Sequence, residues 1–458
     1  MPPFKRDTLN NHAVNDSAPP LFYPAALHET SEMMAATGYA GHHLSRSGST
    51  SDPWGRYYTS PEVSRSLIER IDVPNPKLVL ELGSGSGSLC AAAASRWQAA
   101  RLITVDSDKC ASKRQSEYSL DQSAQHSHFV HDALDEDLPN KIGLRLGTVD
   151  VAVCNPPYIR PRWRADFGSI LEDAGLSGTL ASLHDAGADL LFLAQNLRLL
   201  RRKGKLGLIL PDGLVTAERF SGVRRALLRQ HLIEQVVQLP RSVFKGTEAQ
   251  TYLAVLSKMA GETDQLTLRQ LGPDGQLSSA VNVPQELAAK RMDYTFHAQA
   301  SSAQRMQGGH RRIQVGDALT DVIRGSICSS EIAGFPTAVF HLGDFAKPDG
   351  ENVIRMVPKR FSISDHAART MSRNVHLAWP GDILLARVGR NLQNRLALVV
   401  HGPCVLSDCI FALRATEEHR ERLYRFFESD AGQRALATSA HGVAARFLSK
   451  QNLLEIQF

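Results

Sequence analysis

The sequence has few cysteines, and they follow none of the spacings that hold a zinc ion or a redox pair. No CxxC pair occurs, and no cysteine stands at zinc-ligand spacing from a histidine. Cys404 and Cys409 could face each other, but the scattered, reduced thiols of a cytosolic protein fit the pattern better. We therefore expect neither a metal site nor a disulfide framework. The cysteines are Cys90, Cys110, Cys154, Cys328, Cys404 and Cys409.

Long apolar runs are also missing. No stretch approaches the roughly 18 apolar residues of a membrane-spanning helix, and no apolar segment follows Lys5 and Arg6. We therefore expect a cytoplasmic protein without a leader or a membrane anchor. His42 and His43 fall in a serine-rich tract that we interpret as a loop. With 458 residues, 43% hydrophobic and 22% charged, the chain is long enough for two or three globular domains.

The most informative motif is Asn155-Pro156-Pro157-Tyr158, which follows an apolar run at residues 149–154. An exocyclic amine on a nucleobase is a poor nucleophile because its lone pair is delocalised into the ring. The Asn155 side-chain oxygen and the Pro156 carbonyl could accept from its two N–H bonds and pull the nitrogen toward sp³ geometry. The prolines stiffen the turn, and Tyr158 offers a flat face for a ring. The motif indicates methyl transfer to an amino nitrogen, although many folds contain a strand followed by a Pro-Pro turn.

A glycine-rich turn lies upstream of this motif. The apolar residues 78–80 lead into Glu81 and then into Gly83, Gly85 and Gly87, and a helix-compatible stretch follows. Glycines in such a strand-turn-helix unit let the backbone approach a ligand closely. The Gly-x-Gly-x-Gly spacing is tighter than the dinucleotide pattern and suits a ligand without a pyrophosphate. S-adenosylmethionine is such a ligand, and Glu81 could attract its amino group.

Two further acids follow predicted strands. Asp106 ends the apolar run at 102–105, and Asp132 follows the run at 128–130. Asp106 could hold the ribose hydroxyls of the cofactor, and Asp132 could accept from its adenine amino group. Either acid alone could be a solvated surface residue. Together with Glu81 they favour a site at the carboxyl edge of the sheet, where ligands of open α/β sheets bind.

In this order the motifs resemble the γ class of DNA amino-methyltransferases, especially N6-adenine enzymes related to type I modification subunits and Taq-type enzymes. The resemblance covers residues 52–260 through specific motifs and 297–458 more loosely. Asn155 at the first position of the tetrapeptide favours adenine, since N4-cytosine enzymes more often carry serine there. The resemblance implies an S-adenosylmethionine cofactor and a base flipped out of the duplex.

The resemblance also implies roles for two further segments. A Thr-x-Pro segment of the family folds over the methionine end of the cofactor, and Thr59, Ser60 and Pro61 match it. An aromatic residue after the sixth or seventh strand stacks on the flipped base, on the face opposite Tyr158. Phe244 matches that position.

Strands alternating with helices predict an α/β fold with a doubly wound, mostly parallel, seven-stranded Rossmann-like methyltransferase sheet. Ser60 as N-cap and Pro61 at the first position predict the start of a helix. An apolar helix is predicted at 186–200 with residues 201–204 as its C-cap, and a buried strand follows. The resemblance, rather than the pattern, implies that the last two strands pair as a reversed hairpin.

The predicted division has four parts. It comprises an N-terminal extension at 1–50, partly mobile and with a helix around 26–37, a methyltransferase domain at 51–260, a linker at 261–296, and a smaller α+β target-recognition domain at 297–458. The last part resembles one half of a type I specificity subunit. It carries 20 lysine and arginine residues against 15 acidic ones and so accounts for the whole net charge of +5. This excess favours a surface that faces a polyanion, although an ordinary surface could also carry it.

Basic and amide side chains cluster in two places. The first cluster follows Tyr158 and could contact DNA phosphates or an unstacked base, or could be a solvated loop with one buried tryptophan. The second lies between two predicted C-terminal strands and has the side-chain types that read guanine and adenine edges, hold phosphates or face solvent. The clusters are Arg160, Arg162, Trp163 and Arg164, and Arg387, Arg390, Asn391, Gln393, Asn394 and Arg395.

The sequence therefore predicts a site-specific DNA methyltransferase that acts on N6 of a flipped adenine in double-stranded DNA, within a restriction-modification or phage-defence system. An RNA-base or protein-glutamine N-methyltransferase, or a non-catalytic DNA-binding subunit of a defence complex, remains an alternative. A fused nuclease is not favoured, because residues 1–50 lack a Pro-Asp…Glu-x-Lys spacing. The oligomeric state and the recognition sequence are left open.

Overall fold

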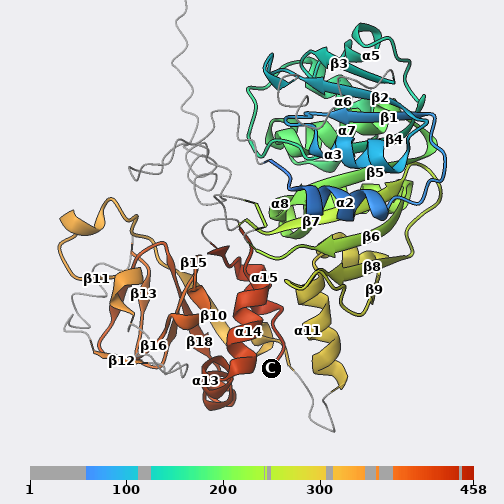
Figure 1. Cartoon of the computed structure of the whole chain (residues 1–458). Coiled ribbons are helices and arrows are strands. Elements are labelled where there is room, and N and C mark those ends of the chain that lie inside the picture. Colours follow the sequence, from blue (N-terminus) through green and yellow to red (C-terminus); the bar gives the residue numbers. More distant parts are fainter. Residues whose placement is uncertain are drawn as a thin grey trace, which may run out of the picture.

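The computed structural model describes residues 58–111, 125–241, 243–244, 249–305, 313–345, 357–360, 375–442 and 446–458. These residues form two lobes, a larger one built on a nine-stranded sheet and a smaller one made of the C-terminal strands and helices (Figure 1). The expectations for the N-terminal extension at 1–50, including its helix, His42 and His43, lie outside the described residues.

The larger sheet is mixed and mostly parallel. Its strand order is β3-β2-β1-β4-β5-β7-β6-β8-β9, and β7 is antiparallel to both β5 and β6, as the resemblance implied. Beyond the predicted seven strands, β8 and β9 extend the sheet. The strands are β1 (Leu78–Leu82), β2 (Arg101–Asp106), β3 (His126–Val130), β4 (Val149–Cys154), β5 (Leu200–Pro211), β6 (Leu232–Gln238), β7 (Thr251–Ser257), β8 (Gln265–Gln270) and β9 (Val281–Pro284).

Helices cover both faces of this sheet, which confirms the doubly wound arrangement (Figure 1). One face packs against α2 and α3 and includes Leu67 and Val153, while the other packs against α6, α7 and α9 and includes Ile170 and Leu191. The central strands are apolar along their length because both of their faces are buried. The helices are α2 (Pro61–Glu69), α3 (Ser88–Arg96), α5 (Leu138–Lys141), α6 (Asp166–Asp173), α7 (Ala188–Leu199), α8 (Asp212–Thr216), α9 (Ser221–Gln230), α10 (Gln285–Lys290) and α11 (Tyr294–Arg305).

The start of α2 follows the sequence prediction. The Ser60 hydroxyl accepts from the backbone N–H of Val63 at 3.4 Å, and Pro61 occupies the first helical position. The hydroxyl satisfies one of the N–H groups that a helix leaves unpaired at its start, and proline loses no helical hydrogen bond there. Ser60 and Pro61 therefore fix where this helix begins, just after Tyr58 and Thr59.

The predicted C-cap at 201–204 is wrong. Helix α7 ends at Leu199, and β5 begins at Leu200 without an intervening loop. A Cβ on Gly204 would lie 2.9 Å from the carbonyl oxygen of Arg201 and 3.1 Å from that of Asp150. The glycine thus permits a close backbone approach within β5 and does not end a helix.

Residues 261–296 do not form the predicted linker. They contribute β8, β9 and α10 to the larger lobe, and β8 pairs with β6 in parallel. Their low apolar density reflects a position at the rim of the sheet, where one side of each strand faces solvent. Leu266, Leu268 and Val283 are the side chains of this edge that enter the core.

The smaller lobe has its own hydrophobic core and three small sheets, with strand orders β10-β18-β14-β16-β12, β11-β17-β13 and β15-β19. Strands β18, β14 and β16 form the middle of the largest of these sheets. Residues 420–439 form two helices and not one, because the Ser429 hydroxyl accepts from the Gly432 N–H at 3.1 Å and begins α14. The elements are β10 (Leu319–Arg324), β11 (Val339–Phe340), β12 (Val357–Arg360), β13 (Leu377–Ala378), β14 (Ile383–Ala386), β15 (Val388–Gly389), β16 (Leu396–His401), β17 (Cys404–Leu406), β18 (Ile410–Ala415), β19 (Arg446–Phe447), α13 (Arg420–Glu428), α14 (Asp430–Ser439) and α15 (Lys450–Leu454).

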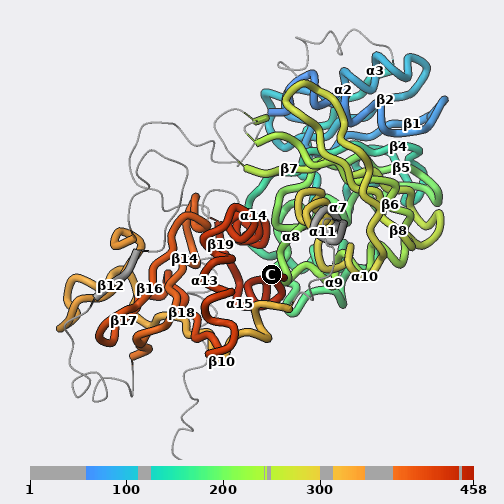
Figure 2. Tube along the Cα trace, turned by 90° about the horizontal axis from the view of Figure 1, so that it is seen from below, coloured from blue at the N-terminus to red at the C-terminus, as the bar shows by residue number. Residues whose placement is uncertain are grey.

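The smaller lobe lies beside the larger one (Figures 1 and 2). Buried polar contacts join the two lobes near the end of β5. Asp212, the first residue of α8, is 6% exposed and accepts from the Gly442 N–H at 2.9 Å and from the Tyr252 hydroxyl at 3.0 Å. Arg291, also buried, donates to the carbonyl of Ser439 at 3.4 Å. Because β5 is the neighbour of β4, the smaller lobe is attached beside the loop that follows β4.

All six cysteines carry free thiols. Within the described part of the chain, no three histidine, cysteine or acidic side chains are grouped so that they could bind a metal ion. The described helices include none that is long and apolar enough to cross a membrane.

Candidate active site

A cavity of about 400 Å³ opens at the carboxyl edge of strands β1, β2 and β4. It brings together the glycine-rich turn, the strand-end acids and the Asn-Pro-Pro turn, which lie far apart in the sequence. The lining residues are Tyr58, Thr59, Glu81, Gly83, Ser84, Gly85, Ser86, Ser88, Leu89, Asp106, Ser107, Asp132, Ala133, Leu134, Asn155, Pro156, Pro157, Ile159, Pro161, Arg162, Arg164, Phe167, Ala188 and Phe192.

The turn between β1 and α3 presents bare backbone to this cavity. Gly83, Gly85 and Gly87 have φ values of +71°, +52° and +83°, a region that residues with a Cβ rarely adopt. A Cβ on Gly83 would also meet the Phe192 ring at 3.0 Å. Gly87 is the N-cap of α3 and does not line the cavity, so its glycine serves the turn itself.

Glu81 is 4% exposed, and one carboxyl oxygen accepts from the Cys90 N–H at 2.9 Å. Burial raises the pKa of Glu81 well above its usual range, and the neighbouring charge of Asp106 raises it further. A bound cation would relieve both effects. A sulfonium compound with an ammonium group, such as S-adenosylmethionine, therefore fits this end of the cavity.

The raised pKa of Glu81 predicts a pH-dependent affinity for S-adenosylhomocysteine, the demethylated cofactor, which keeps the ammonium group. In the free protein the carboxyl holds its proton to a higher pH than usual, and binding of the ammonium group favours the carboxylate and releases that proton. Affinity should then rise with pH through the raised pKa and level off above it. Calorimetry at several pH values, in buffers of different ionisation enthalpy, measures both the affinity and the released proton. Glu81→Gln should flatten this profile, and an unchanged slope in the variant would assign the dependence to another group.

Asp106 ends β2 with both carboxyl oxygens engaged by backbone groups. One oxygen accepts from the Gly85 N–H at 2.7 Å and the other from the Asp108 N–H at 2.8 Å. Each carboxylate oxygen has a second lone pair, so the side chain could also accept from two ribose hydroxyls. Asp106 thus ties the glycine turn to β2 and borders the cavity at the same time.

We predict that Asp106→Ala weakens binding of S-adenosylhomocysteine by about 10- to 100-fold, because hydrogen bonds to a charged acceptor are lost. Calorimetry on the full chain measures the loss. Asp106→Asn is the matched control, since it keeps one acceptor oxygen and the size of the side chain. Its affinity for S-adenosylhomocysteine should lie between those of the wild type and the alanine variant. Unchanged affinity in the alanine variant would remove Asp106 from the ribose site.

The Asn155 amide is held on both sides. Its Nδ2 donates to the Thr59 hydroxyl at 3.0 Å, and its Oδ1 accepts from the Tyr158 hydroxyl at 3.2 Å. An amide oxygen has two lone pairs, so Oδ1 is an acceptor type that suits a target amine. Pro156 and Pro157 line the cavity beside it. The structure therefore joins Thr59 and the tetrapeptide, which are 96 residues apart in sequence, through one hydrogen bond.

Phe244 is not at this cavity. Its side chain is 3% exposed and belongs to the hydrophobic cluster that contains Val237, Leu239 and Leu253. Burying the apolar area of an aromatic ring is favourable when no base stacks on it. The Phe244 ring is buried in the core against β6 and β7. In this conformation Phe244 cannot stack on a base opposite Tyr158.

The loop after Tyr158 is largely held by the protein. Arg160 forms an ion pair with Asp185 at 3.0 Å, and the Trp163 ring packs against Phe167 with a centroid distance of 5.6 Å. Arg162 is exposed and lines the cavity. Of the three arginines in this predicted DNA-binding cluster, Arg160 and Arg164 form ion pairs with described acidic residues, and Arg162 does not.

Sequence reasoning missed three aromatic residues that line the cavity. Tyr58 is half-exposed and lies over Gly85, where a Cβ on the glycine would meet its ring at 3.5 Å. Phe167 and Phe192 border the same space. Tyr58 precedes Thr59 directly, which is a usable signal, but Phe192 is indistinguishable in sequence from the core residues of its apolar helix.

The second predicted DNA-binding cluster is divided by the fold. Arg387 is 3% exposed, and its guanidinium lies 4.5 Å from the centroid of the Phe447 ring. Burial lowers its pKa to about 10, and this position inside the lobe does not suit base reading. Arg390 and Asn391 are exposed, and Arg395 is half-buried.

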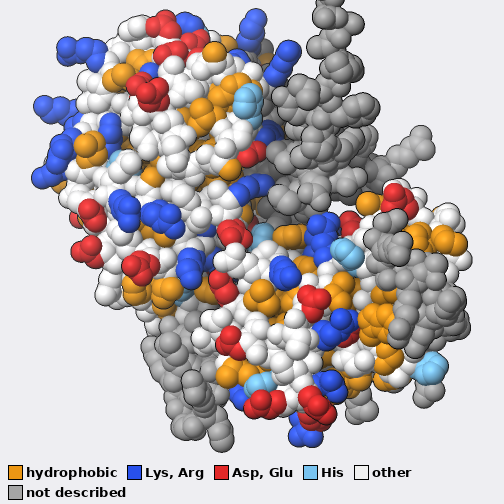
Figure 3. All heavy atoms as spheres, turned by 180° about the vertical axis from the view of Figure 1, so that it is seen from behind, with side chains coloured by type: hydrophobic (Ala, Val, Ile, Leu, Met, Phe, Trp, Pro, Cys, Tyr) orange, Lys and Arg blue, Asp and Glu red, His pale blue; other side chains and the backbone are white. Residues whose placement is uncertain are grey.

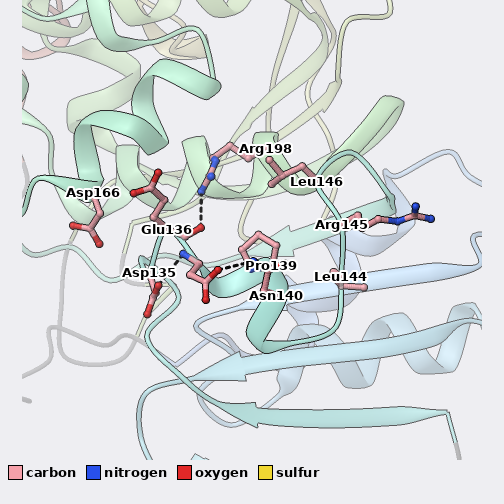
Figure 4. Close-up of a pocket in the computed structure, with 10 residues that line it drawn as sticks. Asp135, Glu136, Pro139, Asn140, Leu144, Arg145, Leu146, Asp166 and Arg198 are labelled. Atoms are coloured by element: carbon pink, nitrogen blue, oxygen red, sulfur yellow. Dashed lines mark hydrogen bonds between the residues drawn. The ribbon is translucent and has the colours of Figure 1, made fainter.

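A second hollow, about 660 Å³ in volume, adjoins the turn after β3 in the larger lobe, and its lining includes Asp135, Asp166 and Arg198 (Figure 4). It is more open than the cavity described above and contains neither the glycine turn nor the Asn-Pro-Pro turn. Arg198 lines this hollow and donates to Asp173 at 2.8 Å. Asp135 and Asp166 of this hollow form ion pairs with Lys141 and Arg164. We therefore place the chemistry in the cavity that the glycine turn and the Asn-Pro-Pro turn line.

Parts of known proteins are similar to this chain. The type I restriction enzyme MpnII methylase subunit of Mycoplasma pneumoniae is 31% identical over 26% of this chain and 22% of its own length. The type I restriction enzyme EcoEI methylase subunit of Escherichia coli is 24% identical over 42% of this chain and 39% of its own length. This chain therefore spans well under half of each relative. A solved structure, the type IIG restriction endonuclease BpuSI, aligns with 88% of this chain and 59% of its own at 13% identity and a TM-score of 0.48.

A further comparison, with models of protein families, gives a match that contains the glycine turn, the strand-end acids and the Asn-Pro-Pro turn. The model of the N-6 DNA Methylase family matches residues 44–273, which is half of the 458 residues. The chain belongs to the N-6 DNA Methylase family.

Proposed function

We propose that this protein is a site-specific DNA methyltransferase that modifies N6 of an adenine flipped out of duplex DNA. The observation that carries the proposal is the placement of Asn155 and Pro156 at the cavity that the glycine turn and Glu81 also line. Family membership supports methylation of DNA with S-adenosylmethionine as the methyl donor. The first asparagine of the tetrapeptide supports adenine as the target base.

The residues around the cavity would act by positioning. The bound cofactor supplies a methyl group on a positively charged sulfur, so the chain need not provide a general base. Asn155 Oδ1 and the Pro156 carbonyl would accept from the target amine and turn its lone pair toward the methyl group. Thr59 and Tyr158 hold the Asn155 amide in place, so little reorganisation is needed during the reaction.

The smaller lobe would recognise the DNA sequence, with residues 297–458 as a target-recognition domain, 51–260 as the methyltransferase domain and 1–50 as an extension. The hydrogen bond from Gly442 to Asp212 supports this role of the smaller lobe, because it attaches that lobe beside the loop that follows β4. A duplex lying along both lobes could then place one base at the cavity. The paired edge strands β8 and β9, within the predicted linker, extend the catalytic sheet in this proposal.

Charge at the junction also supports a polyanion. Burial lowers the pKa of the Arg446 guanidinium, and the nearby positive charge of Arg241 lowers it further. An anion bound between like charges would stabilise both. On the face shown in Figure 3 the basic side chains are scattered over both lobes among acidic ones, so no broad basic patch is seen there. We therefore propose that single arginines, and not a broad patch, contact the phosphates. These arginines are Arg162, Arg241, Arg390 and Arg446.

The names of the relatives support a role in restriction-modification or another defence system, with a partner subunit encoded elsewhere. We expect the protein to act in the cytoplasm on chromosomal DNA. The two alternatives from the sequence, an RNA-base or glutamine methyltransferase and a non-catalytic subunit, find no specific support in the fold.

Single-molecule sequencing of genomic DNA tests the proposal. Cells that express the full chain should carry modified adenine in one fixed motif, and cells with Asn155→Ala should lack it. Purified protein should also transfer labelled methyl groups to duplex DNA that contains this motif, and not to RNA or protein. Label in RNA or protein alone would replace DNA as the substrate, and no label in any of the three would leave a non-catalytic role.

A further inference from the structure

Arg164 lies in the loop after Tyr158 and was predicted to contact DNA. The structure instead surrounds its guanidinium with protein acceptors. Its Nη1 lies 2.6 Å from Asp132 Oδ2, its Nη2 donates to the Leu134 carbonyl at 2.8 Å, and its Nε donates to Asp166 at 3.2 Å. The planar guanidinium therefore already has acceptors for its N–H donors on three sides, and the Asp132 and Asp166 carboxylates balance its charge.

Two of these acceptors belong to the turn that follows β3. The other oxygen of Asp132 accepts from the Leu134 N–H at 2.9 Å, so the turn is closed on itself and then fastened by Arg164. Asp132, Ala133 and Leu134 all line the cavity, as does Arg164. The guanidinium carbon also lies 4.6 Å from the centroid of the Phe167 ring, another part of the wall. Arg164 therefore ties the loop on the target side to the wall formed after β3.

We propose that Arg164 is a positioning residue for the cofactor and not a DNA contact. It holds Asp132 in the orientation that the adenine end of the cofactor requires, and it keeps Ala133 and Leu134 against the cavity. This inference rests on the proposed function, since it assigns Asp132 and its turn to S-adenosylmethionine.

A phosphate would have to compete with Asp132 for the same donors. The Asp132 carboxylate is already 2.6 Å from Arg164, and the pair is supported by the Leu134 carbonyl. Arg162 lies two residues earlier and lines the same cavity. Both arginines are exposed, but Arg164 is paired with Asp132, whereas Arg162 forms no ion pair with any described residue. The two arginines of one loop thus have separate tasks, Arg164 for the cofactor wall and Arg162 for the DNA.

Arg164→Ala and Arg162→Ala in the full chain test this division. We expect Arg164→Ala to weaken binding of S-adenosylhomocysteine by about 5- to 20-fold in calorimetry without DNA, since charge-assisted hydrogen bonds that orient Asp132 are lost. Its KM for S-adenosylmethionine should rise while kcat at saturating cofactor changes little. Arg162→Ala should bind S-adenosylhomocysteine as the wild type does. It should weaken duplex binding, measured by fluorescence anisotropy, and reduce the salt slope of that binding by about 1.

Arg164→Lys guards against a folding defect in the alanine variant. It keeps the charge near Asp132 but cannot hold two acceptors at once, so its affinity for S-adenosylhomocysteine should lie between those of the wild type and the alanine variant. Wild-type affinity in both Arg164 variants would overturn the proposal, and so would a loss of duplex affinity with an unchanged cofactor affinity. If the wild type does not bind S-adenosylhomocysteine at all, the proposed function itself fails.

Discussion

Asn155→Ala is expected to reduce methyl transfer by about 100-fold or more while leaving cofactor and duplex affinity close to wild type. The side-chain oxygen is one of two acceptors that would polarise the target amine, and it acts mainly as the transition state forms. Label transfer from S-adenosylmethionine to duplex DNA measures the rate. Calorimetry with S-adenosylhomocysteine and anisotropy with the duplex measure the two affinities.

Tyr158→Phe is the matched control for this prediction. It keeps the aromatic face for stacking but removes the hydroxyl that donates to Asn155 Oδ1 at 3.2 Å. We expect a smaller loss of rate, because Thr59 still accepts from the Asn155 amide at 3.0 Å. Should Asn155→Ala retain most of the wild-type rate, Asn155 has no part in the chemistry.

Arg224→Met is expected to lower the free energy of unfolding by about 3–5 kcal/mol. Arg224 is 1% exposed, and its guanidinium donates to the carbonyls of Leu214, Ala217 and Ala289 at 2.9 Å each and to that of Lys290. Methionine fills a similar volume but leaves these buried acceptors without a donor. Burial lowers the pKa of Arg224 to about 9, so the side chain is still charged at neutral pH.

Urea unfolding at neutral pH measures this effect, with Arg225→Met as control. Arg225 is the next residue of α9 and is exposed, so its replacement should change the free energy of unfolding by less than about 0.5 kcal/mol. Equal effects of the two substitutions would show that the hydrogen bonds of Arg224 do not hold α8, α9 and α10 together.

Local patterns predicted the central strands and the turns between them. The strand that ends in Asp106, the glycine turn and the strand before Asn155 are each complete within a few consecutive residues, and all three are confirmed. The same kind of evidence failed at residues 201–204. A basic stretch that ends in glycine is typical of a helix C-terminus, but here Gly204 lets neighbouring backbones approach inside β5. Part of this crowding comes from Asp150, a residue of the neighbouring strand β4.

Single side chains were harder to predict than elements. Arg387 and Phe244 have residue types that suit DNA and base contacts, yet both are buried. Arg164 has the same type and loop as Arg162, but Asp132 and Leu134 lie within reach of it. Burial and pairing depend on which distant residues are near in space, and the residue type alone does not carry this information.

The sequence by itself determined the α/β class, the family motifs and the order of the strands that bear them, because glycine turns, apolar runs and proline turns act over a few residues. Only the tertiary structure decided which of these side chains share a cavity. Hydrogen bonds such as that from Asn155 to Thr59 and that from Gly442 to Asp212 join residues 96 and 230 positions apart. Their existence depends on how the helices and strands pack, which no local pattern specifies.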